Sequence, residues 1–165
     1  MVLHAIPTAE GAIQIAMENM PITLHGSNIL IMGFGRIGKI LSKMLAGIGA
    51  RVSVFARKYQ DLVWIKSYGY NPVNLSELGT SINMYNLIVN TVPALVLPAD
   101  LLMRVRKDCL IIDLASEPGG VDFSAAGTLG IKTIHALSLP GKVAPVSAAI
   151  FIKDTIMNII AELGV

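Results

Sequence analysis

Residues 28–38 read Asn-Ile-Leu-Ile-Met-Gly-Phe-Gly-Arg-Ile-Gly, an apolar run that leads directly into three glycines in the spacing GxGxxG. The run 28–32 predicts a buried strand. Residues 36–46 predict a helix that ends at Gly47 and Gly49. The sequence therefore predicts a strand, a tight glycine turn and a helix in direct succession.

This turn has the spacing that dinucleotide-binding sites of Rossmann type use. Gly33 suits the tight turn, Gly35 allows a pyrophosphate to approach the backbone, and Gly38 allows the helix to lie close to the strand. The free amides that begin the helix would then bind the phosphates. Arg36 either contacts a phosphate or is a solvated first-turn cation, and the alternative for the whole turn is a glycine bend without a ligand. The candidate cofactor-binding residues here are Gly33, Phe34, Gly35, Arg36, Ile37 and Gly38.

Short β-branched runs alternate with helical patterns along the rest of the chain. Further strands are expected at 51–56, 72–75, 87–91, 110–114 and 131–135. Helices are expected at 8–20, 59–68, 98–105, 122–129 and 146–163, with Pro98 in a first turn and Ser76 as the N-cap of a short helix after the third strand. Residues 139–145 follow the last expected strand, and no helix or strand is expected there. This alternation predicts an α/β fold with a doubly wound, mostly parallel six-stranded sheet, helices on both faces and an extra helix at each end.

Of the two terminal helices, the last is more apolar than a sheet-covering helix requires. The first has one apolar face, whereas the last is apolar around most of its circumference. Either these helices pack on each other and on the sheet, or they face another domain or a second subunit.

Composition excludes several classes of function. The 165 residues carry a net charge of +2 and are 53% hydrophobic, so the charge is too small to indicate nucleic acid binding. No apolar stretch reaches the length of a membrane span, and no signal peptide is recognisable, which predicts a cytoplasmic protein. The single cysteine, Cys109, excludes an internal disulfide and a multi-cysteine metal site, and we interpret it as a packing residue. No metal is expected.

The end of the second expected strand indicates the cofactor. NAD-preferring sites place an acid there, whereas this chain has Arg57 and Lys58 and no acid before Asp61. A guanidinium can bind a 2′-phosphate that a carboxylate would repel. Arg57 and Lys58 therefore favour NADP(H) over NAD(H), the alternative being a solvated pair of loop cations.

The ends of the later strands should border the nicotinamide half of the cofactor, because ligands of open α/β sheets lie beyond the carboxyl ends of the strands. The candidates are Thr91, Val92, Pro93, Leu114, Ala115, Ser116 and Pro140. The catalytic residue stays unassigned, with His135, Asp113 and Ser116 as weak candidates. Orienting a loop is the favoured role for Asp113, and His4 and His25 have no partners at the spacing of a metal site or a catalytic triad.

Several segments together resemble the A subunits of bacterial dipicolinate synthases. They are Pro-Thr-Ala-Glu-Gly-Ala-Ile-Gln at 7–14, the glycine turn, Asn-Thr-Val-Pro at 90–93, the stretch 112–123 and Leu-Pro-Gly-Lys-Val-Ala-Pro at 139–145. The resemblance implies an oxidoreductase of the mother cell of a sporulating bacterium. Such a protein works with a flavoprotein-like B subunit, forms a homo-oligomer and oxidises a dihydrodipicolinate-level dicarboxylate from lysine biosynthesis to dipicolinate, with hydride transfer to NAD(P)+.

Members of that family carry an N-terminal domain ahead of the Pro-Thr-Ala-Glu-Gly segment. Residues 1–25 are therefore expected to be a leading helix and connector, the remnant of a link to that domain, and residues 26–165 the NAD(P)-binding domain. The chain alone should be weak or inactive, because hydride transfer requires a positioned substrate. The alternatives are another two-domain dehydrogenase, of the hydroxyacid or methylenetetrahydrofolate type, and a non-catalytic dinucleotide sensor.

Overall fold

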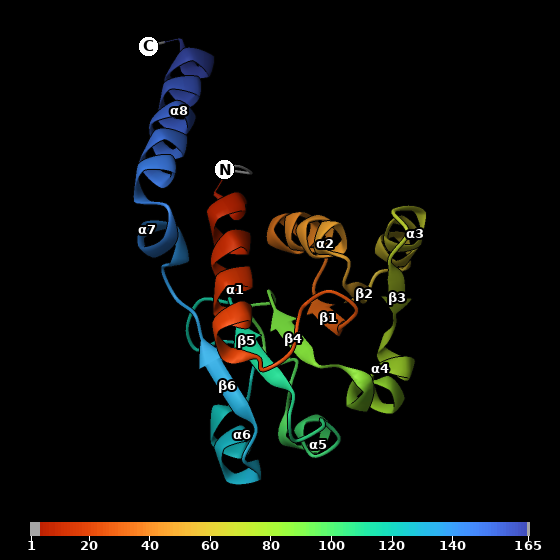
Figure 1. Cartoon of the computed structure of the whole chain (residues 1–165). Coiled ribbons are helices and arrows are strands. Elements are labelled where there is room, and N and C mark those ends of the chain that lie inside the picture. The colour runs from red at the N-terminus through yellow and green to blue at the C-terminus, as the bar shows by residue number, and fades with distance from the viewer. Residues whose placement is uncertain (1–3, 165) are drawn as a thin grey trace.

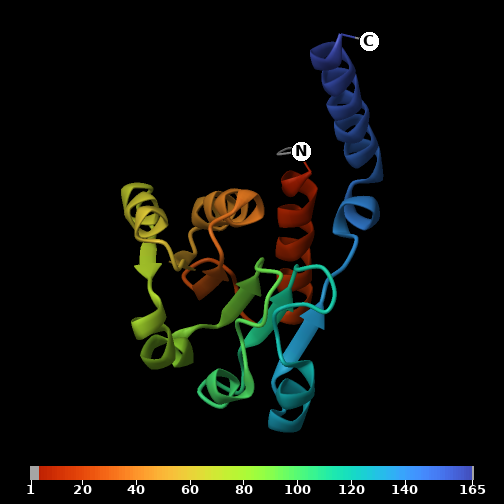
Figure 2. The same ribbon diagram turned by 180° about the vertical axis from the view of Figure 1, so that it is seen from behind.

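The computed structural model describes residues 4–164, in which six strands form one parallel sheet (Figures 1 and 2). The strand order is β3-β2-β1-β4-β5-β6. Successive strands are therefore added outward from β1 in one direction up to β3, and from β4 in the other direction up to β6. Leu30 of β1 lies opposite Ser53 of β2 and Ile88 of β4. This is the doubly wound order of dinucleotide-binding folds, and it confirms the predicted fold class. The strands are β1 (Asn28–Met32), β2 (Arg51–Phe55), β3 (Asn71–Val73), β4 (Leu87–Asn90), β5 (Leu110–Asp113) and β6 (Lys132–His135).

Helices cover both faces of the sheet, because successive strand side chains point to opposite sides. Ile29 and Ile31 of β1 pack in one core, and Leu30 and Met32 pack in the other. The first face carries α1 (Ala5–Asn19), α2 (Arg36–Ile48), α3 (Tyr59–Ser67) and α7 (Leu139–Val143). The second carries α4 (Leu75–Ser81), the 3-10 turn η1 (Ile82–Met84), α5 (Ala99–Leu102) and α6 (Phe123–Leu129).

Helix α1 is part of the first core. Ala9, Ala12 and Ala16 are at most 1% exposed, and their small side chains let the helix lie close to the sheet. A Cβ on Gly11 would lie 2.9 Å from Cγ2 of Val143, so this glycine allows α7 to pack against α1. The leading segment is therefore held in place by side chains that no solvent reaches.

Three short elements differ from the sequence-based expectation. Ser76 is not the N-cap of α4: Asn74 is, and its side chain accepts a hydrogen bond from the amide of Glu77 in a capping box. A helix that the sequence did not indicate, α7, occupies most of residues 139–145. The helix expected at 98–105 is only α5, with Pro98 at its N-cap rather than in its first turn. The amides of Arg104 and Val105 bond to carbonyls three residues back, so tighter turns replace the rest of the helix.

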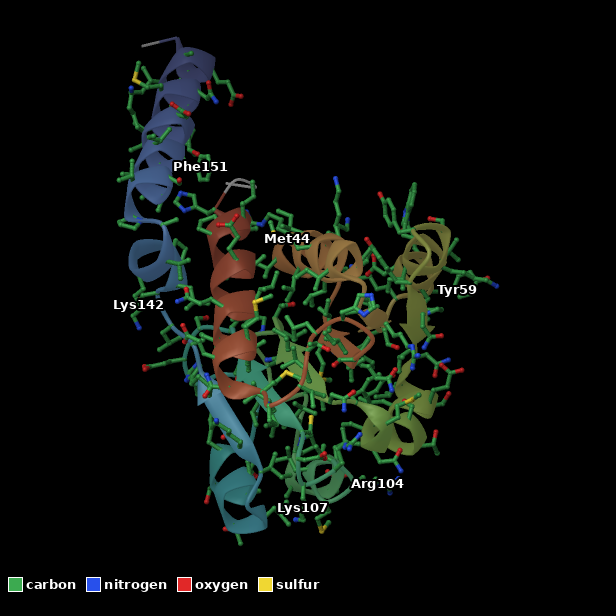
Figure 3. The ribbon with its side chains drawn as sticks, in the orientation of Figure 1. Met44, Tyr59, Arg104, Lys107, Lys142 and Phe151 are labelled. Atoms are coloured by element: carbon green, nitrogen blue, oxygen red, sulfur yellow. The ribbon has the colours of Figure 1, made fainter. Side chains whose placement is uncertain are left out.

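Helix α8 (Pro145–Leu163) extends away from the sheet (Figures 1 and 2). Ala148 is its one buried residue within the described chain, so the interpretation that α8 packs on the sheet is wrong. Figure 3 shows Phe151 on this helix, well apart from Met44 of α2 in the body of the domain. None of the helices within residues 4–164 has the length and hydropathy to cross a membrane. The large apolar side chains that α8 exposes are Val146, Ile150, Ile152, Ile156, Met157, Ile159, Ile160 and Leu163.

Candidate functional site

The glycine turn after β1 uses its three glycines for three different reasons. Gly33 has φ +102°, and a Cβ there would lie 2.6 Å from Oγ1 of Thr91. A Cβ on Gly38 would lie 2.1 Å from the carbonyl oxygen of Gly33, so the turn and the helix could not pack together. A Cβ on Gly35 would meet no atom within 4 Å, which means that this residue faces open space. The turn is therefore tightly packed at Gly33 and Gly38, and it is accessible at Gly35.

The N-terminus of α2 offers unpaired backbone donors at this open surface. Gly35 is the N-cap and has no side chain that could accept from the first amides of the helix, and the first turn contains no acid. The first N–H groups of a helix have no partner within the helix, and its N-terminus carries a partial positive charge. The exposed guanidinium of Arg36 adds a full positive charge. This end of α2 is suited to an anion.

A cavity of about 540 Å³ lies beyond the carboxyl ends of β1, β4 and β5. It brings together nine of the residues selected from the sequence: Gly35, Arg36, Ile37, Thr91, Pro93, Leu114, Ala115, Ser116 and Pro140. His4, Ala5 and Thr8, from the start of α1, complete its wall. These three were not predicted from the sequence, because no motif or spacing indicates where α1 lies relative to the sheet.

A second cavity of about 260 Å³ lies on the β2 side of the glycine turn. Arg57 and Lys58 line it, and both are exposed. Asp61 lines the same space, so two cations face one carboxylate. The two cavities share Gly35, Thr91 and Pro93, which means that they adjoin across the glycine turn. The remaining lining residues of this cavity are Gly33, Phe34, Phe55, Ala56, Val92 and Val96.

Every cofactor candidate from the sequence except Gly38 therefore lines one of these two cavities. Gly38 lies beneath the turn, where it sets the distance between α2 and β1. Asp61, Val96, Phe55 and Ala56 were not selected. Phe55 ends β2 and Ala56 follows it, next to Arg57, so their position could have been inferred from the same strand-end argument.

A buried polar pair holds the loops that border the larger cavity. Asp113 and Asn90 end β5 and β4, and neither side chain is exposed to solvent. Oδ1 of Asp113 accepts hydrogen bonds from Nδ2 of Asn90, at 2.8 Å, and from the amide of Ala115, at 3.0 Å. Its Oδ2 accepts from the amide of Gly120, at 2.7 Å. The Asp113 carboxylate thus orients loops and does not reach the cavity.

Two neighbouring glycines permit this arrangement. A Cβ on Gly119 would lie 2.6 Å from Oδ2 of Asp113, and one on Gly120 would lie 2.3 Å from Nδ2 of Asn90. The loop after β5 can therefore close over the polar pair only without side chains at these positions. Asn90 itself was not selected from the sequence, although its place directly before Thr91 could have indicated it.

His135, the other catalytic candidate, is engaged in structural contacts. Its Nε2 lies 2.8 Å from the carbonyl oxygen of Ala115, and its ring stacks on Phe123 with centroids 5.1 Å apart. Ser116 is exposed and lines the larger cavity. Of the three candidates, Ser116 alone is in direct contact with that cavity, and His4 is the one histidine of the described chain that lines it.

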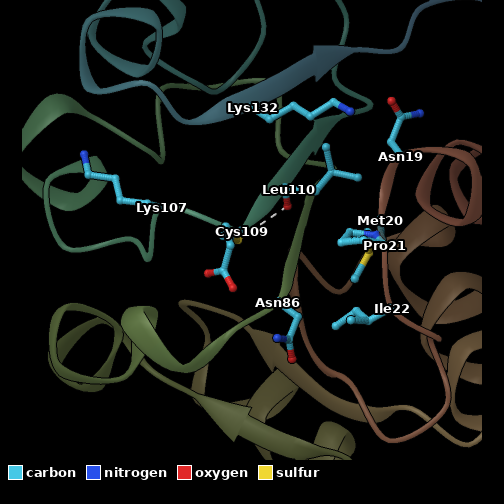
Figure 4. Close-up of a pocket in the computed structure, with 10 residues that line it drawn as sticks. Asn19, Met20, Pro21, Ile22, Asn86, Lys107, Cys109, Leu110 and Lys132 are labelled. Carbon is cyan, nitrogen blue, oxygen red and sulfur yellow. Dashed lines mark hydrogen bonds between the residues drawn. The ribbon is translucent and has the colours of Figure 1, made fainter.

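A further cavity, of about 280 Å³, lies at the amino ends of the strands, opposite the two cavities above. It is placed between the end of α1 and the starts of β5 and β6 (Figure 4). Cys109 lines it but is 1% exposed, and burial raises the pKa of its thiol to about 12. A protonated, buried thiol is a poor nucleophile. This agrees with the packing role expected for Cys109. Residues 4–164 contain no group of three or more His, Cys, Asp or Glu side chains placed to hold a metal ion.

Known proteins match both the sequence and the fold. Residues 7–115 match the family described as "D-isomer specific 2-hydroxyacid dehydrogenase, NAD binding domain". The chain is 36% identical, over 98% of its length, to the A subunit of dipicolinate synthase from Bacillus subtilis strain 168, and it spans 54% of that protein. It thus spans about half the length of this curated relative.

Solved structures give the same result. The A chain of dipicolinate synthase from Bacillus subtilis superposes with a TM-score of 0.96 at 36% identity, over 99% of this chain and 55% of that one. The A subunit of dipicolinate synthase from Bacillus halodurans superposes with a TM-score of 0.93 at 37% identity, over 97% and 55% of the two chains. The resemblance seen in the sequence is confirmed. The chain belongs to the NAD-binding domain family of the D-isomer specific 2-hydroxyacid dehydrogenases, and it is an NAD-binding domain of the dehydrogenase type.

Proposed function

We propose that this chain is the cofactor-binding part of an oxidoreductase of the dipicolinate synthase A type. In the proposed reaction a dihydrodipicolinate-level dicarboxylate is oxidised to dipicolinate. The nicotinamide dinucleotide would supply the hydride acceptor. The similarity to the A subunit of dipicolinate synthase supports this reaction. The proposal includes a flavoprotein-like B subunit as partner, a homo-oligomeric state and a place in the cytoplasm of a sporulating mother cell.

One observation carries the cofactor part of this proposal. The uncapped N-terminus of α2 lies at Gly35, a residue that lines both cavities. A pyrophosphate at this point would bridge the two, with the nicotinamide half in the larger cavity and the adenosine half in the smaller one. The α2 amides and Arg36 would then bind the diphosphate. Thr91, Ser116 and Pro140 would border the nicotinamide ring.

We further propose a preference for NADP(H). Arg57 and Lys58 line the smaller cavity, where the adenosine ribose would lie. A 2′-phosphate carries about two negative charges that a guanidinium binds in bidentate geometry. Asp61 lines the same cavity but is outnumbered by the two cations.

The catalytic step requires groups that touch the substrate. Asp113 is a positioning residue, because its carboxylate is buried and accepts three hydrogen bonds from neighbouring loops. His4 and Ser116 are polar side chains that line the larger cavity from the start of α1 and from the loop after β5. The dicarboxylate would enter between them, with Arg36 available to neutralise one carboxylate.

A binding titration tests the cofactor part. Calorimetry and nicotinamide fluorescence should show saturable binding of NADPH, and weaker binding of NADH, by the chain alone. Gly35→Ala should weaken both by about tenfold or more, because the new methyl group would occupy the approach of the diphosphate. Gly47→Ala is the matched control, since a Cβ there also meets nothing within 4 Å but lies at the far end of α2. Absence of binding to the unaltered folded chain would refute the proposal.

The match to the 2-hydroxyacid dehydrogenase family favours one alternative, the oxidation of a D-2-hydroxyacid. An activity assay separates the two functions. The chain should be joined to the part of a dipicolinate synthase A subunit that it does not span, and supplied with the B subunit. Dipicolinate formation supports the first proposal. Reduction of NAD(P)+ by a D-2-hydroxyacid, without dipicolinate formation, supports the alternative, and the chain alone should be weak or inactive with both substrates.

A further inference from the structure

A third side of the glycine turn borders a separate cavity. This cavity, of about 230 Å³, lies between α2 and the end of α3 and is lined by Phe34, Lys39, Ile40, Lys43, Tyr68 and Tyr70. We refer to these six residues as the aromatic pocket. It shares one residue, Phe34, with the smaller of the two cofactor cavities. The proposed cofactor site does not use the other five.

Aromatic rings form one wall of the aromatic pocket. The Tyr68 ring lies 6.1 Å from Phe34 and 6.3 Å from Tyr70, measured between centroids. Tyr68 also stacks on Trp64, at 5.9 Å between centroids with an interplanar angle of 27°. Trp64 is 52% exposed and Tyr68 is 58% exposed. A chain with only 5% aromatic residues thus gathers four rings at one place and leaves two of them open to solvent.

Two lysines form the facing wall. Lys39 and Lys43 lie one helical turn apart on α2, so their ammonium groups project from the same face. The Nζ atom of Lys39 lies 5.2 Å from the centroid of the Phe34 ring. This cation–π contact holds the ammonium at the pocket wall before any ligand arrives, which lowers the ordering cost of binding. The six lining residues, all within the described chain, include no carboxylate.

We propose that the aromatic pocket binds a small planar aromatic anion, a single ring system that carries carboxylate or phosphate groups. The ring would stack on Tyr68, and the anionic group would pair with Lys39 and Lys43. Cavities that hold drug-sized ligands measure about 300–1,000 Å³. The pocket is smaller, so it suits one ring system and not a whole dinucleotide.

Binding in the aromatic pocket would act on the cofactor site through Phe34. This residue follows Gly33 in the glycine turn, is 7% exposed and lines both cavities. A ligand that displaces the Phe34 ring or removes Lys39 from it changes the wall of the smaller cofactor cavity. The ligand and the dinucleotide should therefore alter each other's affinity by the same factor.

Two probe molecules test this proposal, and they represent two sources of a planar aromatic anion. One is pyridine-2,6-dicarboxylate, whose choice rests on the proposed function because it would be the reaction product. The other is adenosine 5′-monophosphate, a purine that carries a phosphate. The test is a titration of the whole chain with each probe, followed by the emission of Trp64, its only tryptophan. Because Trp64 stacks on Tyr68, occupation of the aromatic pocket should change its emission in a saturable way.

The variants assign the signal to the aromatic pocket. The double variant Lys39→Ala/Lys43→Ala should weaken binding of the active probe by about tenfold or more, since charge-assisted pairing is lost. Lys66→Ala is the matched control, because it removes an exposed lysine of α3 that does not line the pocket. Unchanged unfolding curves establish that the variants fold.

The outcomes are distinct from those of the cofactor test. If a probe binds, Gly35→Ala should leave its affinity unchanged while weakening NADPH. A probe whose signal is lost in Gly35→Ala but kept in the double lysine variant binds in the cofactor cavities, which overturns the assignment for that probe. Failure of both probes to change Trp64 emission overturns the proposal, and so does equal affinity for the uncharged pyridine-2,6-dicarboxamide. The Trp64 titrations and the lysine variants give their result whether or not the chain binds NADPH.

Discussion

Arg57 and Lys58 are the residues on which the proposed preference for NADP(H) rests. They follow β2 directly and face the smaller cofactor cavity, where an NAD-preferring site would place an acid. Lys58 is also the residue that precedes the first turn of α3. Their positive charges have no ion-pair partner within the described residues, so they are available to a phosphate.

Arg57→Ala should weaken NADPH by about tenfold or more while changing NADH affinity by less than about twofold. The reason is that the guanidinium pairs with a 2′-phosphate that NADH lacks, and a charge-assisted hydrogen bond contributes about 1.5–3 kcal/mol. Fluorescence titration of both cofactors measures the two effects in one variant, with NADH as the internal control. An equal loss for both cofactors would show that Arg57 has no role in their discrimination.

Asp113→Asn should lower the free energy of unfolding by about 1–3 kcal/mol, because a buried donor without a partner costs about that much. The carboxylate accepts from Asn90, Ala115 and Gly120, and an amide nitrogen in place of one oxygen would face a donor. Urea denaturation measures the loss. Asp122→Asn is the control, since this N-cap accepts from the amide of Ala125 and asparagine caps equally well. Similar losses in the two variants would contradict this account.

At the scale of elements, the strands agreed with the sequence better than the short helices did. A strand of five apolar residues between two layers has one consistent environment, so its pattern alone predicts it. α4, α5 and α7 are at most seven residues long, and such helices depend on caps and packing rather than on periodicity. The helix expected at 98–105 ended early for this reason.

Asn74→Ala should destabilise the chain by about 1 kcal/mol, because it removes the capping box that begins α4. Asn74 accepts from the amide of Glu77, and the Glu77 carboxylate accepts from the amide of Asn74 in return. Thermal unfolding measures the change. Ser76→Ala should have a smaller effect, since the Ser76 hydroxyl donates only to the Asn74 side chain and no backbone group depends on it. A larger loss for Ser76→Ala would restore the original assignment of the cap.

The whole molecule has two terminal helices with opposite roles. α1 buries Ala9, Ala12 and Ala16 against the sheet, whereas α8 buries only Ala148. The sequence shows apolar residues on one face of α1 and around most of α8. Their environments differ because α1 lies beside α2 and α7 on the sheet, and α8 begins beyond α7 and points away from it (Figure 1).

Removal of residues 145–165 should change the free energy of unfolding by less than about 1 kcal/mol, because little buried apolar area is lost. The shortened chain should also aggregate less, since many exposed apolar side chains leave with α8. The contrasting variant removes residues 1–19 and should not fold, because it exposes the first core. Denaturation curves and light scattering distinguish these results. A shortened chain without α8 that fails to fold would contradict the assignment of α8 as an external helix.

The cofactor candidates after β4, β5 and β6 came from one rule, that ligands of a parallel sheet lie beyond the carboxyl ends of its strands. This rule selects residues that follow strands, such as Thr91 and Ser116, without any knowledge of distances. It could not select His4 and Thr8, which come from a helix that precedes the first strand. The same rule gave no indication that Lys39, Lys43 and Tyr68 would line the aromatic pocket, because they belong to two separate helical segments.

The amino-acid sequence by itself determined the doubly wound sheet, the glycine turn and its relation to a helix N-terminus. The turn and its helix are local, since they interact with their nearest neighbours in the chain, and the sheet follows from the alternation of strands and helices because crossovers between parallel strands are right-handed. Only the tertiary structure decided that Asp113 accepts hydrogen bonds from Asn90 and Gly120. It also decided that α1 belongs to the core and α8 does not, and that four aromatic rings meet beside α2. Those contacts join segments far apart in the chain, and their geometry depends on how the layers pack rather than on any pattern within one segment.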